Sequence, residues 1–219
     1  DDNSALFGGG LTNFGMINML ESTLEDNEAN NQAGAILNNG TLIIEDSTLT
    51  DNTAELAGGA IENNGELTIS GSELTLNTVE LEGDDVEGGG AILNNEDGIL
   101  IITDTTFFNN LARTIGGAIA NFGELDISES TFDANLTERE DGGAIYMDTD
   151  DDLLIVIRDS TFTSNRAGRN GGVMYIEAGT LEMTDCELNQ NHANGNAAGM
   201  FINGTASLIN VNARENTEQ

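Results

Sequence analysis

The sequence predicts an all-β fold, a right-handed parallel β-helix (solenoid) of about eight three-strand coils. Two motifs repeat together along the 219 residues, one rich in glycine and one of the form apolar-x-x-Asn. Short alternating runs such as residues 99–102 recur, and no stretch shows the 3.6-residue period of an amphipathic helix. One copy of about 27 residues cannot bury a core alone, but it can stack on its neighbours. The right hand follows from the general preference of parallel crossovers.

The two motifs divide the chain into coils. The second glycine of the first motif falls at Gly9, Gly34, Gly59, Gly90, Gly117, Gly143, Gly172 and Gly199. The asparagine that closes the second motif falls at Asn27, Asn52, Asn77, Asn110, Asn135, Asn165, Asn191 and Asn216. We interpret these asparagines as a structural ladder, because stacked amides can hydrogen-bond from coil to coil and to the corner backbone. The repeats predict a single domain over residues 1–219, with loop insertions at 78–88 and 148–152.

Aligning the coils also predicts what fills the interior. One apolar column is Ile36, Ile61, Ile92, Ile119, Ile145, Met174 and Phe201, and another is Ile44, Ile69, Ile102, Ile127, Ile157 and Met183. A second polar column is Asn13, Asn38, Asn63, Asn94 and Asn121. Cys186 stands in a column of serines and threonines, which indicates a small corner side chain. The single histidine, His192, excludes a multi-histidine zinc site and a histidine-based triad.

The composition is strongly acidic. The chain has 39 acidic residues against 6 basic ones, all of them Arg, and its formal net charge is −33. Without a basic stripe it is not expected to bind nucleic acid. Part of the acid is periodic, at Glu21, Asp46, Asp104, Glu129, Asp159 and Asp185. Bridging divalent cations or a halophilic-type high ionic strength would screen the repulsion within such a column.

Calcium is the cofactor that the acidic loops suggest. Asp148, Asp150, Asp151 and Asp152 form the first candidate site, and Asp84 with Asp85 forms the second. Ca²⁺ prefers oxygen ligands of this kind, although neither segment has the spacing of an EF-hand. A solvated acidic loop is an equally open interpretation of each. Sequons at Asn39, Asn135 and Asn203 leave glycosylation open.

The two motifs resemble the repeats of the polymorphic outer membrane proteins of chlamydiae and of related secreted β-helix proteins. The cleanest copy is Gly-Gly-Ala-Ile at residues 116–119 with Phe-x-x-Asn at residues 132–135. The resemblance implies a parallel β-helix and an exported passenger that acts in adhesion. It therefore implies an extracellular or cell-surface location with the signal peptide already removed, and we expect no membrane span.

The two ends suggest assembly. Written one after the other, residues 216–219 and 1–9 resemble an ordinary connection between coils. We therefore favour a non-enzymatic extracellular subunit that stacks end to end into a filament or surface fibre, because an open head-to-tail contact does not close. The subunit interface would comprise Leu6, Phe7, Leu11, Phe201, Leu208 and Val211.

Two other functions remain open. The first is an adhesin or autotransporter-like passenger fragment that binds a cell surface or a polysaccharide, with its long loops as recognition sites. The second is a polysaccharide lyase or hydrolase, for which Arg158 beside Asp159, with Arg166 and Arg169, is the only basic cluster near acids. Two Tyr and no Trp leave little for sugar stacking.

Overall fold

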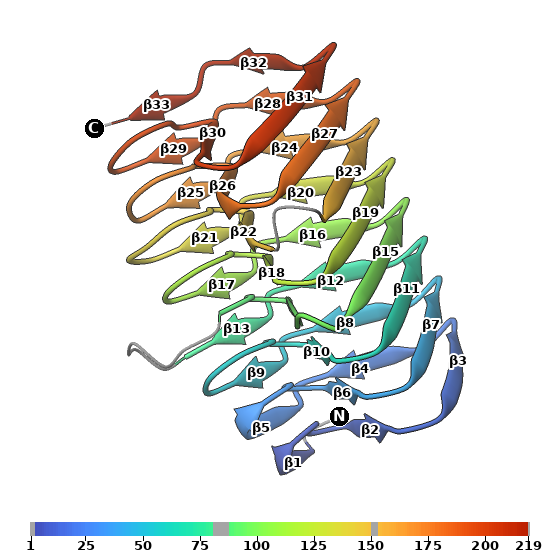
Figure 1. The fold of residues 1–219 in the computed structure, drawn as a ribbon. Coiled ribbons are helices and arrows are strands. Elements are labelled where there is room, and N and C mark those ends of the chain that lie inside the picture. Colours follow the sequence, from blue (N-terminus) through green and yellow to red (C-terminus); the bar gives the residue numbers. More distant parts are fainter. Residues whose placement is uncertain (1–2, 81–87, 150–152, 219) are drawn as a thin grey trace.

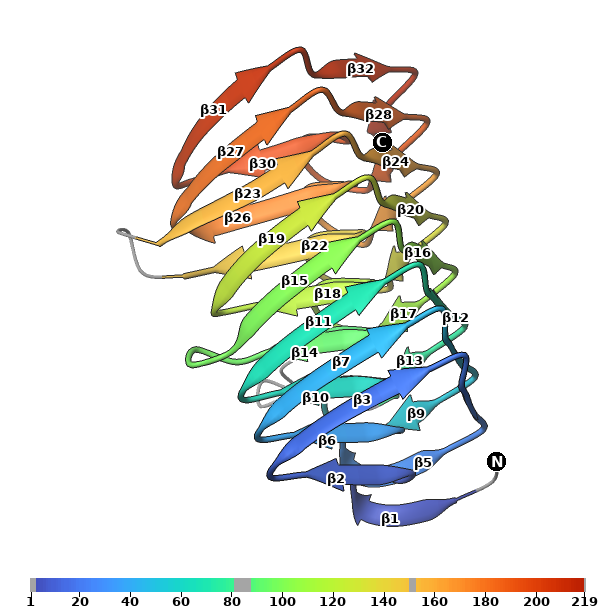
Figure 2. The same cartoon turned by 90° about the vertical axis from the view of Figure 1, so that its right-hand side faces the viewer.

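The computed structural model describes residues 3–80, 88–149 and 153–218, which form a parallel β-solenoid without any helix. The coils stack from the N-terminal end to the C-terminal end of the molecule (Figure 1). In Figure 2 the strands of the near sheet run upward from left to right while the chain rises from its N-terminus, so the solenoid is right-handed. Among the described residues no helix could span a membrane.

Each coil contributes four strands in place of the expected three, and the strands pair in parallel into four sheets. Sheet A consists of β1 (Ser4–Phe7), β5 (Glu28–Gln32), β9 (Thr53–Ala54), β13 (Thr78–Val79), β17 (Leu111–Ala112), β21 (Leu136–Thr137), β25 (Arg166–Ala167), β29 (His192–Ala193) and β33 (Thr217–Glu218). Most strands of sheet A have only two residues, too few for an alternating pattern to appear in the sequence.

The other three sheets carry the repeated motifs. Sheet B consists of β2 (Leu11–Asn13), β6 (Ile36–Asn38), β10 (Ile61–Asn63), β14 (Ile92–Asn94), β18 (Ile119–Asn121), β22 (Ile145–Asp148), β26 (Met174–Ala178) and β30 (Met200–Ile202). Sheet C consists of β3 (Met16–Leu20), β7 (Thr41–Glu45), β11 (Glu66–Ser70), β15 (Ile99–Thr103), β19 (Glu124–Ser128), β23 (Leu154–Arg158), β27 (Thr180–Thr184) and β31 (Thr205–Ile209). Sheet D consists of β4 (Thr23–Glu25), β8 (Thr48–Thr50), β12 (Glu73–Thr75), β16 (Thr106–Phe108), β20 (Thr131–Asp133), β24 (Thr161–Thr163), β28 (Glu187–Asn189) and β32 (Asn212–Arg214).

The corner between sheets C and D turns on one residue with a left-handed backbone. These residues are Glu21, Asp46, Gly71, Asp104, Glu129, Asp159, Asp185 and Asn210, with φ between 47° and 56°. They include the whole periodic acidic column. Glycine, asparagine and aspartate tolerate this backbone region better than other residues, which explains why glycine and asparagine interrupt the acids. The acidic column therefore has a geometric role at each corner.

The core follows the predicted columns except in the last coil. Three stacked rings fill its centre: Phe107 and Phe132 lie 4.6 Å apart between centroids, and Phe132 and Phe162 lie 4.8 Å apart. In the eighth coil Met200 pairs with Met174, so Phe201 points outward, and its prediction as a core residue was wrong. The alignment slipped by one residue because Ala198, rather than Gly199, takes the place of the second glycine opposite Gly172.

The eight asparagines that close the repeated motif are hydrogen-bonded from coil to coil. From Asn52 onward, each accepts, at its side-chain oxygen, bonds from the backbone N–H and the side-chain amide of the asparagine one coil earlier, at 2.9–3.1 Å. Asn3, which the sequence pattern did not reveal, begins the series by donating to Asn27 at 2.8 Å. We call this series, Asn3 included, the asparagine ladder.

A second amide chain supports the corner between sheets B and C. Asn13, Asn38, Asn63, Asn94 and Asn121 each lie 2.8 Å from the next, side-chain nitrogen to side-chain oxygen. Several also donate to a backbone carbonyl of the corner, as Asn121 does to Gly123 at 2.9 Å. Because these amides are almost fully buried, their polar atoms must find partners within the protein.

We predict that Asn135→Ala lowers the free energy of unfolding by roughly 2–4 kcal/mol, because buried groups would lose their partners. Asn135 accepts two bonds from Asn110 and donates to Asn165 and to the carbonyl of Phe107, all at 3.0–3.1 Å. Denaturant unfolding followed by circular dichroism measures the loss. The exposed Asn18 on β3 serves as the control, and its alanine variant should change stability by less than about 0.5 kcal/mol. Equal effects at both positions would contradict a special role for the ladder.

Candidate functional site

The outer surface of sheet B carries three of the aromatic side chains that point away from the core. The middle residue of each three-residue segment points outward, because its two neighbours face the interior. From the third coil to the eighth these outward residues are Glu62, Leu93, Ala120, Tyr146, Tyr175 and Phe201. We call this surface the sheet B face.

In the middle coils the sheet B face is covered. Ala57, Leu93 and Ala120 are fully buried and form an apolar cluster separate from the main core. Ile115 and Phe122 pack against this cluster and stay partly exposed. The connections that follow sheet A therefore fold over sheet B and hold Phe122 in place.

Toward the C-terminal coils the face carries an aromatic strip. The ring of Phe122 lies 6.1 Å from that of Tyr146, at an interplanar angle of 51°. Tyr146 and Tyr175 stack at 5.6 Å and 4°, and Tyr175 and Phe201 stack at 5.0 Å and 5°. The stacked rings follow the spacing of the coils, about 4.8 Å. Because these stacked rings cover one another's faces, Tyr146, Tyr175 and Phe201 remain only partly exposed.

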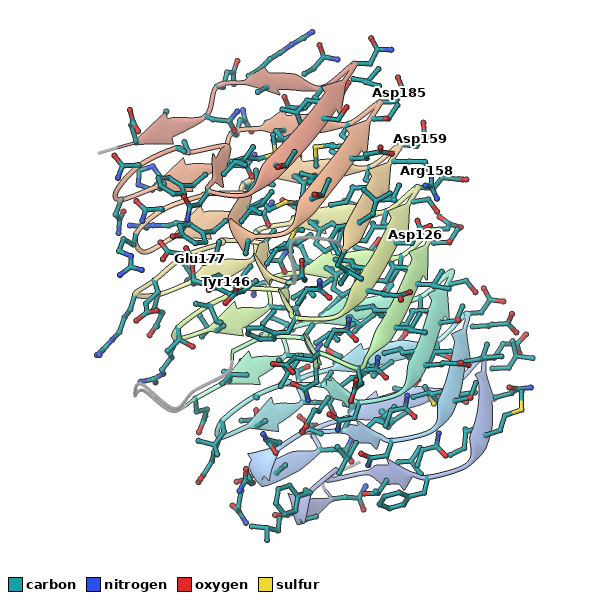
Figure 3. All side chains as sticks on the ribbon, viewed as in Figure 1. Asp126, Tyr146, Arg158, Asp159, Glu177 and Asp185 are labelled. Carbon is teal, nitrogen blue, oxygen red and sulfur yellow. The ribbon has the colours of Figure 1, made fainter. Side chains whose placement is uncertain are left out.

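Acidic groups border the aromatic strip. The hydroxyl of Tyr175 donates to the carboxylate of Glu177 at 2.6 Å, and burial together with this bond raises the pKa of Tyr175 to about 12. Burial and the nearby carboxylate of Asp148 raise the pKa of Tyr146. The pKa of Asp148 is itself raised, first by burial and then by Glu177. Figure 3 shows Tyr146 and Glu177 next to each other on this side of the solenoid.

An ion pair between the buried carboxylate of Asp141 and the half-exposed side chain of Arg169 lies near Tyr175. Asp141 is 2% exposed and accepts bonds from the guanidinium of Arg169 and from the backbone N–H of Asn170. The bond to Asp141 raises the pKa of Arg169. Arg169 therefore serves as a structural partner of Asp141. Its positive charge also lowers the pKa of Tyr175, but burial and the neighbouring acidic groups raise that pKa by more.

The other basic residues of the predicted catalytic cluster lie apart from the strip. One guanidinium nitrogen of Arg158 donates to both carboxylate oxygens of Asp126 in the preceding coil, at 2.8 and 3.0 Å, and both side chains are about two-fifths exposed. Figure 3 places this pair, with Asp159, on the opposite side from Tyr146. Arg166 donates to Asn194 at 3.2 Å on the surface. Such exposed contacts are typical of surface ion pairs and contribute little to stability.

Of the six carboxylates predicted to bind calcium, only Asp148 belongs to the described residues. Asp84, Asp85, Asp150, Asp151 and Asp152 lie outside them. Within residues 3–80, 88–149 and 153–218 no group of three or more His, Cys, Asp or Glu side chains could hold a metal ion.

The predicted interface residues lie on the two end coils. Leu6, Phe7 and Leu208 are 59%, 41% and 45% exposed, whereas Leu11, Phe201 and Val211 are partly buried. Phe14, Met16 and Leu20 add exposed apolar surface to the first coil.

The thiol of Cys186 is buried and donates to the carbonyl of Thr184, and burial raises the pKa of this thiol. His192 contacts Thr217 and Asn194.

We predict that Asp148 lowers stability at neutral pH. Because the pKa of Asp148 is raised in the folded state, ionisation of its carboxyl group lowers the free energy of unfolding. This loss is absent below the unfolded-state pKa of 3.8 and grows as the pH rises through the folded-state pKa. Asp148→Asn should therefore raise Tm at about pH 7 and leave it unchanged at about pH 3, as measured by thermal circular dichroism. An equal Tm difference at both pH values would contradict this assignment.

Comparison with known proteins identifies the type of repeat. The model of the Chlamydia polymorphic membrane protein repeat matches residues 104–121, which contain one apolar-x-x-Asn motif and the next Gly-Gly-Ala-Ile motif. The chain is 27% identical over 128 residues to the probable autotransporter YfaL of Escherichia coli (strain K12). That alignment covers 55% of this chain and 10% of YfaL, so the chain spans a small part of the length of this relative. No solved structure matches. The chain is thus a β-solenoid in which residues 104–121 are similar to the Chlamydia polymorphic membrane protein repeat.

Proposed function

We propose that this chain forms the rod of an extracellular surface protein and that the sheet B face makes an adhesive contact. The aromatic strip is the observation that carries the proposal. Tyr146, Tyr175 and Phe201 are stacked outside the main core. Aromatic side chains that remain partly exposed are enriched where proteins contact partners.

The similar sequences support the location. One match is described as a polymorphic membrane protein repeat and the other as a probable autotransporter, and both descriptions fit a protein at the cell surface. The scaffold supports the role of a rod, since each coil contacts only its neighbours and the solenoid therefore extends in one direction. A rod of this kind holds a contact face at a distance from the cell.

Antibody labelling of intact, unfixed source cells tests the location. We expect label on intact cells and loss of that label after treatment with an external protease. Label that appears only after the cells are permeabilised would refute an extracellular role.

A double substitution tests the adhesive face. Source cells that carry Tyr146→Ser with Tyr175→Ser should show a several-fold loss of attachment to surfaces or to other cells after washing. The matched control is Ile101→Ser with Phe108→Ser, because these side chains are 42% and 43% exposed on sheets C and D. Equal attachment by both variants would contradict the assignment of adhesion to the sheet B face. Immunoblots of cell surfaces verify equal display.

A head-to-tail filament is a second candidate. Leu208 is 45% exposed at the end of a column whose earlier member Met183 is fully buried, so the last coil leaves core surface uncovered. In a continuous stack, β2, β3 and β4 of one copy would pair with β30, β31 and β32 of the copy before it. Sheet A, however, has nine strands against eight in the other sheets, so β1 and β33 would then compete for one place.

Sedimentation velocity distinguishes the two candidates. If the ends are complementary, a variant that lacks residues 1–7 should assemble more readily than the chain with β1, and Leu208→Glu should abolish that assembly. The measurement is repeated with calcium, with a chelator and at high salt, because the sequence predicts that cations bridge or screen the acidic column. Monomers of both chains in every arm would exclude the filament and leave the adhesive rod.

A further inference from the structure

A pocket lies at the corner between sheets B and C, next to the aromatic strip. It has a volume of about 450 Å³ and is lined by Asn64, Asn95, Glu96, Asp97 and Phe122. The turn from Asn95 to Gly98 is two residues longer than the equivalent turns in the neighbouring coils, such as Asn64 to Gly65. The longer turn provides one wall, and the volume lies in the usual range of small-molecule sites. We call this the corner pocket.

A buried carboxylate positions the amides of the corner pocket. Glu62 is 5% exposed and accepts bonds from the side-chain amides of Asn64 at 3.2 Å and Asn95 at 3.1 Å. Asn95 also donates to the side-chain oxygen of Asn64. The amide orientations are therefore fixed before any ligand arrives. Preorganised polar groups of this kind reduce the entropy that binding costs.

Phe122 supplies the apolar wall of the corner pocket. Its ring is held from behind by the cluster of Ala57, Leu93 and Ala120, and it is tilted by 51° to the ring of Tyr146. The tilt means that Tyr146 does not stack on the face of Phe122 as the later rings stack on one another. The pocket thus combines a fixed aromatic ring with a rim of amides and carboxylates.

The polar rim restricts what the corner pocket can hold. Glu96 and Asp97 stand at its edge, and the chain carries a net charge of −33, so an anionic ligand would be repelled. A purely apolar ligand would remove Glu96, Asp97 and the amide oxygens from water without offering them a hydrogen-bond donor. A pyranose ring fits this lining, because it has an apolar C–H face for Phe122 and hydroxyl groups for the amides and carboxylates.

We propose that the corner pocket binds a neutral sugar residue of a glycan chain that runs along the solenoid axis. The direction follows from the amide column that leads away from the pocket, in which Asn64 donates to Asn39 one coil earlier at 3.2 Å. Asn39, Asn64 and Asn95 offer such groups in three successive coils, at intervals of about 4.8 Å. The inference rests on the proposed adhesive role, for which it names the ligand class.

Isothermal titration of the purified chain against a panel of hexasaccharides tests the proposal. The panel contains neutral gluco-, manno-, galacto- and xylo-oligosaccharides, with an oligogalacturonate and a glucosamine oligomer as charged members. We expect at least one neutral member to bind, with an affinity that falls about tenfold in Phe122→Leu and in Asn95→Ala. Phe122→Leu keeps an apolar side chain against the buried cluster, so the fold should persist.

Phe14→Ala is the matched control. Phe14 occupies the same corner position in the first coil, is 79% exposed and does not line the corner pocket. Its substitution should leave binding unchanged. Binding of no neutral member, preferential binding of a charged member, or an equal loss in the Phe14 and Phe122 variants would overturn the proposal. Because titration uses purified protein, such a failure leaves the surface location to be decided by cell labelling.

Discussion

The fold depends on the need to satisfy buried amide groups at every corner of the solenoid. Where the chain passes from sheet D to sheet A, the backbone N–H of the ladder asparagines from Asn27 to Asn191 points along the axis to the next coil, and there it meets the side-chain oxygen of the next ladder asparagine. Asn110, Asn135 and Asn165 are fully buried, so water cannot take over these bonds. A coil with an apolar residue at this position would leave donors on its neighbour without partners. The ladder therefore fixes both the register and the spacing of the coils, and the apolar columns pack in consequence.

Once the interior is fixed in this way, variation is confined to the outside of the solenoid. The strands of sheet B keep an inward residue such as Ile119 or Ile145 in every coil, while the outward residue between them changes from Glu62 to Ala120 to Tyr175. Insertions likewise occur at corners, as between Asn95 and Gly98. The aromatic strip and the corner pocket both arise on this variable surface. This separation is typical of repeat proteins, in which a constant core carries a variable contact face.

The sequence was informative about the interior and much less so about the surface. The parallel β-helix and its columns could be predicted because residues such as Ile119 and Asn135 recur at a fixed spacing, and a buried position accepts few side chains. The fourth strand was missed because two-residue strands such as β17 show no alternation. The eighth coil was misaligned because Ala198 replaces a glycine there. The aromatic strip could have been found by aligning Tyr146 with Tyr175, whereas the contact of Glu62 with Asn95 joins coils of unequal length and leaves no periodic signal.

Amide hydrogen exchange tests the central role of the asparagine ladder most directly. The backbone amides of Asn77, Asn110 and Asn135 can exchange only when neighbouring coils separate, because each donates to a buried side-chain oxygen of the next coil. We predict that these amides exchange most slowly and at similar rates, far more slowly than the amide of the exposed turn residue Glu96. If they exchanged as fast as Glu96 while the strands of sheets B and C stayed protected, the ladder would not hold the coils together.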